Sequence, residues 1–243
     1  MTDDVNIGNV IRQHLEAEQF FAGFAVKGPS DESELQQEDD MPAAQRASEL
    51  ETLAGKVRQC RKCDLGSSRT NAVPGEGNPD ARIMFVGEAP GADEDARGCP
   101  FVGRAGQLLD KIIAACGLKR GDVYIGNILK CRPPENRDPR ADEIIACLPY
   151  IQKQIELIEP EIIVALGAHA ARTLLDNTKS IGEMRGQFHE YYAGLGQIPV
   201  KLMATYHPAY LLRSYSPENR RKVWEDMKKV LTELGLPIPE KAK

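Results

Sequence analysis

From residue 82 onward, short apolar runs alternate with longer stretches in which apolar residues recur at helical spacing. This alternation predicts parallel strands joined by crossover helices, with helices on both faces of the sheet. We therefore expect an α/β fold, a three-layer α/β/α sandwich around a mostly parallel four-stranded sheet. The predicted strands are 83–87, 123–129, 161–166 and 198–205, and the predicted helices are 103–117, 139–158, 168–176 and 217–234.

The beginning of the chain has a different pattern. Residues 8–21 space their apolar side chains for a short amphipathic helix, whereas residues 28–45 are acidic and almost free of large apolar groups, which predicts a disordered linker. We expect an N-terminal extension over 1–46 and one folded domain over 47–243. The extension either recruits a protein partner through its amphipathic end or is dispensable.

The excess of acidic over basic residues lies in the N-terminal part of the chain. The net charge is −5, but residues 1–56 hold twelve acidic and four basic residues, while the remainder holds 24 acidic and 27 basic residues. Basic clusters lie at 58–62, 130–140 and 213–222. Such clusters suit contacts with phosphate groups, although each could equally be a solvated surface.

The chain lacks signals for a membrane or for export. No apolar run approaches the ~20 residues that cross a bilayer. The N-terminus lacks the basic-then-apolar order of a signal peptide, so we expect a cytoplasmic protein with no membrane partner. Because the cytoplasm is reducing, the six cysteines are expected to be thiolate ligands or buried thiols rather than disulfides.

Four of these cysteines can meet at one edge of the predicted sheet. Cys60 and Cys63 form a CxxC pair before the first strand, Cys131 ends the second strand, and Cys147 lies in the next helix. Four thiolates complete either a tetrahedral zinc site or a cubane iron–sulfur cluster, and the spacing leaves the metal open. Four unrelated buried cysteines are the alternative.

The segment 83–103 carries the clearest candidate for a ligand site. The first strand stops at the turn Gly87-Glu88-Ala89-Pro90-Gly91, and the ring of Phe101 follows. In open α/β sheets, ligands bind just past the carboxyl ends of strands. Three acids, at 93–95, lie in between. An ordinary strand-to-helix loop with solvated acids is the alternative for the whole segment.

Two polar side chains end other strands. Asn127 offers a donor and an acceptor that match the edge of a pyrimidine base, or it is simply hydrogen-bonded there. His207 follows the last strand, where it can donate to a developing oxyanion, whereas the other three histidines lack that setting. Leu211 and Leu212 follow beside Arg213 and either fill the gap left by an extruded base or pack under the last helix.

In combination, these motifs resemble the family 4 uracil-DNA glycosylases. The resemblance rests on GEAPG with the downstream Asp95, on PFVGRAGQLL, NILKCRPP and HPAYLLR, and on a cysteine arrangement equal to that of Cys60, Cys63, Cys131 and Cys147. It covers about residues 57–235 and leaves the N-terminal extension outside.

The resemblance implies a uracil-glycosylase fold over 47–243, a mainly structural [4Fe-4S] cluster on the four cysteines, and a monomer that hydrolyses the N-glycosidic bond of uracil in DNA. It also implies a role for each candidate residue. Gly87 and Ala89 present backbone groups to the uracil, Phe101 stacks on it, and Asn127 hydrogen-bonds to its edge. His207 stabilises the negative charge on the uracil, while Glu88, and after it Asp95, stabilises the sugar or orients water; the acids at 93–94 are then expected to be solvated. Leu211 is the wedge into the duplex, and DNA is contacted by Arg132 and Arg213.

Two departures qualify this interpretation. Ala89 stands where better-known uracil glycosylases have an aspartate, so that residue cannot activate water here. In our scheme Glu88 takes its place. Ala92 stands where family members often have an acid, so our scheme does not depend on a carboxylate there. A related branch traps DNA covalently through a histidine in an inserted basic loop. The corresponding residues 132–142 hold no histidine, which predicts turnover by hydrolysis. The competing hypotheses are a non-catalytic iron–sulfur protein that binds DNA or senses redox state, and a zinc-stapled nucleotide-binding module.

Overall fold

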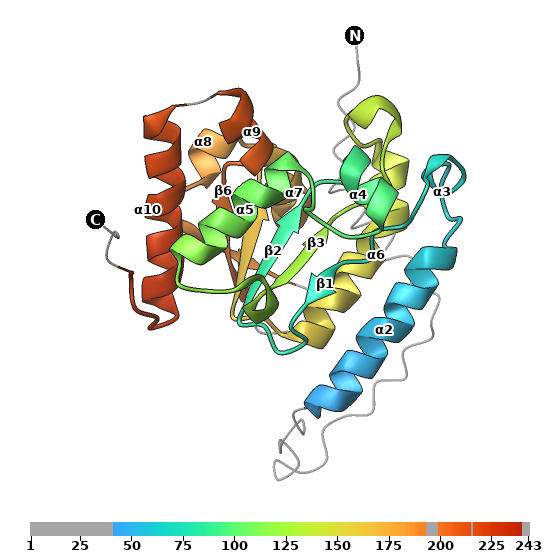
Figure 1. The fold of residues 1–243 in the computed structure, drawn as a ribbon, viewed down its shortest axis with the longest axis horizontal. Coiled ribbons are helices and arrows are strands. Elements are labelled where there is room, and N and C mark those ends of the chain that lie inside the picture. Colours follow the sequence, from blue (N-terminus) through green and yellow to red (C-terminus); the bar gives the residue numbers. More distant parts are fainter. Residues whose placement is uncertain (1–40, 193–198, 215, 240–243) are drawn as a thin grey trace, which may run out of the picture.

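A computed structural model describes residues 41–192, 199–214 and 216–239 (Figure 1). The helix predicted over 8–21 and most of the linker predicted over 28–45 lie outside these residues. Helix α2 begins at Ala43, so the boundary expected between residues 46 and 47 falls inside a helix. Among the described residues, no helix combines the length and the apolar character needed to span a membrane.

The centre of the fold is a six-stranded sheet in the order β1-β3-β2-β4-β6-β5. Strands β3, β2, β4 and β6 are parallel neighbours, which confirms the four strands expected from the sequence. Two short antiparallel edge strands, β1 and β5, were not expected. The bounds are β1 Glu76–Gly77, β2 Ile83–Gly87, β3 Tyr124–Asn127, β4 Ile162–Leu166, β5 Phe188–Tyr191 and β6 Val200–Thr205.

Helices cover both faces of this sheet, as the predicted three-layer sandwich requires. Side chains of α2, α6 and α7 pack on one face, around Met84 and Ile163. Side chains of α5, α9 and α10 pack on the other, around Phe85 and Val164, and Figure 1 shows α5 and α10 on the side opposite α6. The bounds are α2 Ala43–Gln59, α3 Leu65–Ser68, α4 Ala92–Arg97, α5 Arg104–Ala115, α6 Ala141–Ile158, α7 Ala168–Leu175, α8 Ile181–Met184, α9 Pro208–Arg213 and α10 Pro217–Glu233.

The central strands are buried on both faces, and this explains their sequence. All five residues of β2 and all five of β4 are buried, so neither strand alternates between polar and apolar positions. The parallel register places Gly87 of β2 opposite Asn127 of β3, and Leu166 of β4 opposite Thr205 of β6. The carboxyl ends of the four central strands therefore meet at one edge of the sheet.

Candidate active site

A cleft of about 620 Å³ opens at this edge. Its walls come from the segments that follow the four central strands and from the loop before α5. Six of the residues singled out from the sequence line it, namely Glu88, Ala89, Phe101, Asn127, His207 and Arg213. Among its other lining residues are Glu94, Asn136, Arg137, His169, Ile181, Tyr206 and Tyr210.

The ends of β2 and β3 are locked together beneath the cleft. The backbone N–H of Ile128 donates to the carbonyl of Gly87, and that of Leu129 donates to the carbonyl of Glu88, both at 2.9 Å. A Cβ atom on Gly87 would lie 2.4 Å from Asn127 Oδ1 and 2.6 Å from Phe101 Cζ. Position 87 therefore needs glycine so that the Asn127 and Phe101 side chains can come together over the strand end.

Asn127 presents an unpaired acceptor. The residue is only 2% exposed, and its Oδ1 atom has no hydrogen-bond partner among the described residues. A buried polar atom left without a partner costs free energy, so such atoms usually have a reason to persist. Because Asn127 lines the cleft, a ligand that donates a hydrogen bond to Oδ1 would remove this cost.

The ring of Phe101 is held in place by its own backbone. Phe101 has a φ of 51°, in the left-handed region that bulky residues rarely adopt. Arg120 donates to the Phe101 carbonyl at 3.3 Å, and it also forms ion pairs with Glu76 and Asp110. Gly106 leaves room for the same carbonyl, since a Cβ there would lie 1.8 Å from it. These contacts fix a flat apolar surface in the cleft wall.

Glu94 connects the turn after β2 to the Phe101 segment, and the expectation that it is merely solvated was wrong. One of its carboxylate oxygens accepts from the Val102 and Gly103 backbone N–H groups at 2.8 and 2.9 Å, and the other accepts from Gly91 N–H at 3.1 Å. The signal available in the sequence was its place three residues after Gly91, the position of a capping glutamate at a helix start.

His207 stands at the start of α9 with a fixed tautomer. Its Nδ1 atom accepts the Ala209 backbone N–H at 3.0 Å, so the ring proton of the neutral imidazole lies on Nε2. Burial, and to a lesser extent the charge of Arg213, lower the pKa of His207 to about 4. The Phe101 ring lies 5.7 Å away between centroids. His207 therefore brings a neutral N–H donor to the cleft.

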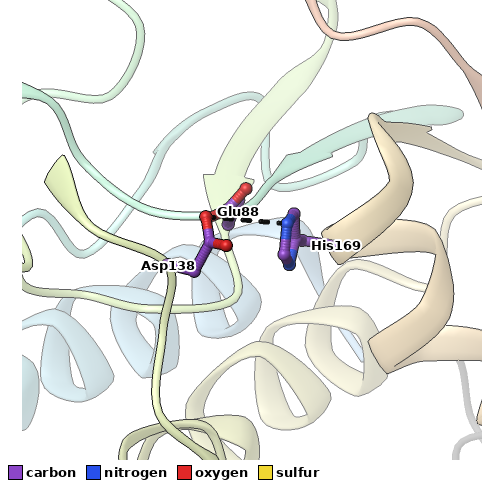
Figure 2. A group of neighbouring side chains, drawn as sticks. All are labelled: Glu88, Asp138 and His169. Atoms are coloured by element: carbon purple, nitrogen blue, oxygen red, sulfur yellow. Dashed lines mark ion pairs between the residues drawn. The ribbon is translucent and has the colours of Figure 1, made fainter.

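Glu88 lies in a group with two side chains that sequence reasoning did not select. Figure 2 shows Glu88, Asp138 and His169 converging from the turn after β2, the loop before α6 and the start of α7. One oxygen or nitrogen atom of each side chain lies within 4.8 Å of those of the other two. Burial raises the pKa of Glu88; Asp138 raises it further, while His169 and Arg213 oppose the shift. The expectation that His169 lacks a strand-end setting was wrong. The helix at whose start it lies, α7, follows the end of β4, so the strand-end rule used for Asn127 and His207 also applies to it.

Asp95 does not reach the cleft, which corrects its expected place beside Glu88. The side chain is buried, and its carboxylate accepts from the Thr70 backbone N–H at 2.9 Å and from the Asn71 N–H at 3.3 Å. Asn71 in turn donates to the Asp95 carbonyl at 2.8 Å. Asp95 therefore anchors the segment that follows α3.

Leu211 is not available as a surface wedge. It is 3% exposed and packs in the core beneath α5 and α10, whereas its neighbour Leu212 is 38% exposed. Successive side chains of the short helix α9 point to different faces, and no sequence pattern distinguishes the buried leucine from the exposed one. Arg213 lines the cleft, and Arg132 lies beside it, donating to Asn136 Oδ1 at 2.8 Å.

The two leucines should therefore differ in their effect on stability. We expect Leu211→Ala to lower the free energy of unfolding by about 2–5 kcal/mol, because it leaves a cavity in the core. Leu212→Ala should change it by less than about 0.5 kcal/mol, as is usual for surface positions. Denaturant unfolding of both variants measures this, and equal losses would mean that α9 packs differently in solution.

The four selected cysteines line a separate, small cavity. Cys60 and Cys63 come from the segment between α2 and α3, Cys131 follows β3, and Cys147 belongs to α6. The Lys130 backbone N–H donates to Cys147 Sγ at 3.2 Å, and Arg69 Nη1 donates to Cys131 Sγ at 3.0 Å. Burial raises the pKa of Cys147 to about 12, so this sulfur becomes a thiolate only with a compensating cation.

Comparison with known proteins decides the family. The model of the uracil DNA glycosylase superfamily matches residues 74–228. The chain belongs to this superfamily. It is 49% identical to a type-4 uracil-DNA glycosylase of Saccharolobus solfataricus over 186 residues, which cover 74% of this chain and 84% of that protein. It is also 49% identical to the type-4 uracil-DNA glycosylase of Thermotoga maritima, covering 74% of this chain and 92% of that one.

These relatives place the chain among the type-4 uracil-DNA glycosylases, as its motifs had indicated. A type-5 uracil-DNA glycosylase of Pyrobaculum aerophilum is more distant, with 33% identity over 68% of this chain and 78% of that protein. The superfamily match begins at residue 74, so it includes Cys131 and Cys147 and leaves out Cys60 and Cys63. It spans every described residue of this glycosylase that lines the large cleft.

Proposed function

We propose that this protein is a uracil-DNA glycosylase whose cleft holds a uracil flipped out of DNA and hydrolyses its N-glycosidic bond. The observation that carries the proposal is the unpaired, buried Oδ1 of Asn127 in the cleft wall. Uracil has an N3–H donor beside a carbonyl acceptor, which complements an amide with one acceptor and two donors. The uracil edge thus supplies the hydrogen bond that the protein leaves unmade.

The same contact explains selection against cytosine. Cytosine has an acceptor at N3 and an amino group in place of the neighbouring carbonyl, so both positions would face the wrong part of the Asn127 amide. A buried site that leaves polar groups mismatched rejects an analogue far more strongly than an apolar pocket does. Phe101 adds a stacking surface that favours any flat base, and Asn127 then chooses among them.

His207 acts on the departing base. When the bond between the sugar C1′ and the uracil N1 breaks, its electron pair moves onto the uracil ring, and negative charge grows on the ring oxygens. The neutral Nε2–H of His207 can donate to the oxygen that gains this charge, and the capped Nδ1 keeps the donor aimed without reorganisation. Because burial lowers its pKa, His207 is neutral, and because Nδ1 is an acceptor its one ring proton lies on Nε2. It therefore stabilises the uracil anion by hydrogen bonding alone.

Glu88 acts on the sugar side of the reaction. Water adds to C1′ as the uracil leaves, and a carboxylate is needed to orient that water, take its proton and offset the positive charge on the sugar. Glu88 lies in the cleft, and burial raises its pKa above that of a solvated glutamate, which makes its carboxylate a better base. Asp138 and His169 lie beside it and set its electrostatic surroundings.

The cysteine cavity fits the [4Fe-4S] cluster that the family resemblance implies. Four sulfurs converge there from three separate segments, and two N–H donors point at them, as suits thiolates. The cluster would be held by Cys60, Cys63, Cys131 and Cys147, and its contribution would be structural. It would connect the segment after α2 to α6 and to the residues that follow β3, the strand that ends at Asn127.

The remaining parts of the proposal concern DNA and its setting. We place Arg213 and Arg132 at phosphates, since both lie at or beside the cleft, and Leu212, rather than Leu211, at the gap in the duplex. In the same proposal the enzyme is a monomer in the cytoplasm, the reducing compartment that cysteine thiolates require. The extension over 1–46 then serves a protein partner or is dispensable.

Base release tests the function. The cluster-loaded protein is incubated with oligonucleotides that carry one uracil opposite adenine, opposite guanine or in a single strand, and is then treated with alkali. We expect strand cleavage at uracil and none at cytosine in matched controls. Intact strands in the presence of measurable DNA binding would instead favour the non-catalytic DNA-binding protein.

A further inference from the structure

Lys130 is a buried cation between the cysteine cavity and the uracil-reading strand end. It is 1% exposed, and its Nζ atom donates to the Asn127 carbonyl at 2.8 Å and to Gln154 Oε1 at 2.6 Å. Both acceptors are neutral, and within the part of the chain that the structure describes no carboxylate forms an ion pair with Lys130. A buried ammonium group without an anionic partner is strongly unfavourable.

The Lys130 contact with Asn127 is part of a rigid arrangement. Gln154 of α6 is held by two further hydrogen bonds, to the Pro74 carbonyl at 2.8 Å and to the Tyr124 hydroxyl at 2.9 Å. Its Oε1 atom is therefore fixed as an acceptor for Lys130. The ammonium group in turn holds the backbone of Asn127, whose side chain carries the unpaired acceptor.

The other side of Lys130 belongs to the cysteine cavity. Its backbone N–H donates to Cys147 Sγ at 3.2 Å, its neighbour in the chain is Cys131, and Lys130 lines the cavity with the four cysteines. A cubane cluster with four thiolate ligands carries net negative charge. That charge is the anion that the buried Lys130 otherwise lacks.

We propose that Lys130 is a positioning residue that fixes Asn127 for reading uracil and that its charge is balanced by the cysteine-bound cluster, so that one side chain links cluster retention to base recognition. This inference rests on the proposed function and deepens it. A cluster-bound protein would hold the ammonium group, and with it Asn127, in the reading position. Loss of the cluster would leave an unbalanced charge next to that position.

Three variants separate the two roles of this side chain. K130M removes both the charge and the donor, K130Q removes the charge but keeps a donor for the Asn127 carbonyl, and R69M removes a different cation that contacts Cys131 and not Asn127. Two quantities are measured for each cluster-loaded variant. One is the half-life of the cluster in excess chelator, followed by its broad absorption at about 400 nm. The other is the affinity for free uracil, measured by calorimetry.

We expect all three variants to lose the cluster about tenfold faster than the wild type, because each removes a positive charge beside it. Only K130M should bind free uracil about tenfold more weakly, as one lost hydrogen bond at Asn127 allows. If K130M does not fold, Gln154→Leu, which frees the ammonium group from its fixed acceptor, should weaken uracil binding in the same way.

Two outcomes would overturn the inference. Wild-type cluster retention in K130Q would mean that the charge of Lys130 does not balance the cluster, and wild-type uracil affinity in K130M would mean that Lys130 does not position Asn127. Either result with an active wild-type enzyme leaves the proposed function intact. A wild-type protein that releases no uracil would instead contradict the proposed function itself.

Discussion

Replacing His207 by alanine is expected to lower kcat for uracil release by about 10²–10³-fold, with affinity for uracil-containing DNA within about threefold of the wild type. The reason is that its Nε2–H bonds most strongly to the uracil oxygen that gains negative charge as the bond breaks. In the ground state that oxygen is a neutral carbonyl, so binding depends on His207 much less than the rate does. Single-turnover kinetics with saturating enzyme measure the effect.

Two variants serve as controls for this experiment. His207→Ala also removes the cap on the Ala209 N–H, which costs stability of about 1 kcal/mol, whereas His207→Asn can keep that cap. His207→Asn should therefore match His207→Ala in its loss of activity and the wild type in stability. His189 bonds to the Met184 carbonyl outside the cleft, and His189→Ala should leave kcat unchanged. Equal losses in His207→Ala and His189→Ala would contradict the assignment.

The pH profile adds a test of the protonation states. Because the pKa of His207 is lowered to about 4, the neutral donor is already formed above about pH 5, and the rate should not fall as pH rises through 6.5. Glu88 must be ionised to take the proton of water, so its raised pKa should set the acid limb above the range of an ordinary glutamate. A rate that falls between pH 6 and 7.5 would indicate a catalytic imidazolium instead.

Replacing Asn127 by alanine is expected to lower kcat/KM for uracil by about 10²–10⁴-fold and to remove most of the selection against cytosine. Without the amide, the cleft loses the group to which we assign the distinction between the donor and acceptor positions of the two bases. The substitution also deletes the buried, unpaired Oδ1 atom, so the melting temperature should stay the same or rise slightly. Competition between uracil- and cytosine-containing oligonucleotides, with a thermal melt, measures both effects.

This combination distinguishes a binding residue from a structural one. A large loss of activity together with a large loss of stability would mean that Asn127 holds the end of β3 together through contacts of its side chain. A large loss of activity with unchanged stability would mean that the amide is kept for the ligand. The account requires the second result.

The sequence predicted the parts of the site that follow from strand ends. Continuous apolar runs located the four parallel strands. Two polar residues at their carboxyl ends, Asn127 as the last residue of β3 and His207 just after β6, proved to line one cleft. Parallel strands place their carboxyl ends together whatever the details of packing, so proximity could be inferred without coordinates. Glu88 was found in the same way because it directly follows β2, whereas Phe101 was selected as the aromatic ring in the segment after that strand.

The errors concern features that depend on packing. Edge strand β5 has one buried residue among four, so it lacks the apolar run that marks a strand. Leu211 and Leu212 differ only in which side of a short helix faces the core. The roles of Asp95 and Glu94 were also predicted wrongly. Both are acids in the short helix α4, which the pattern did not predict, and only the positions of backbone N–H groups show that each holds a neighbouring segment.

The central claim is that uracil completes the unmade hydrogen bond of Asn127 in this cleft. A crystal structure of the cluster-loaded protein with free uracil tests it most directly. The account predicts the uracil ring stacked on Phe101, its N3–H directed at Asn127 Oδ1, and a ring oxygen within hydrogen-bond distance of His207 Nε2. Uracil bound elsewhere, or bound in the cleft with Asn127 Oδ1 still unpaired, would contradict it.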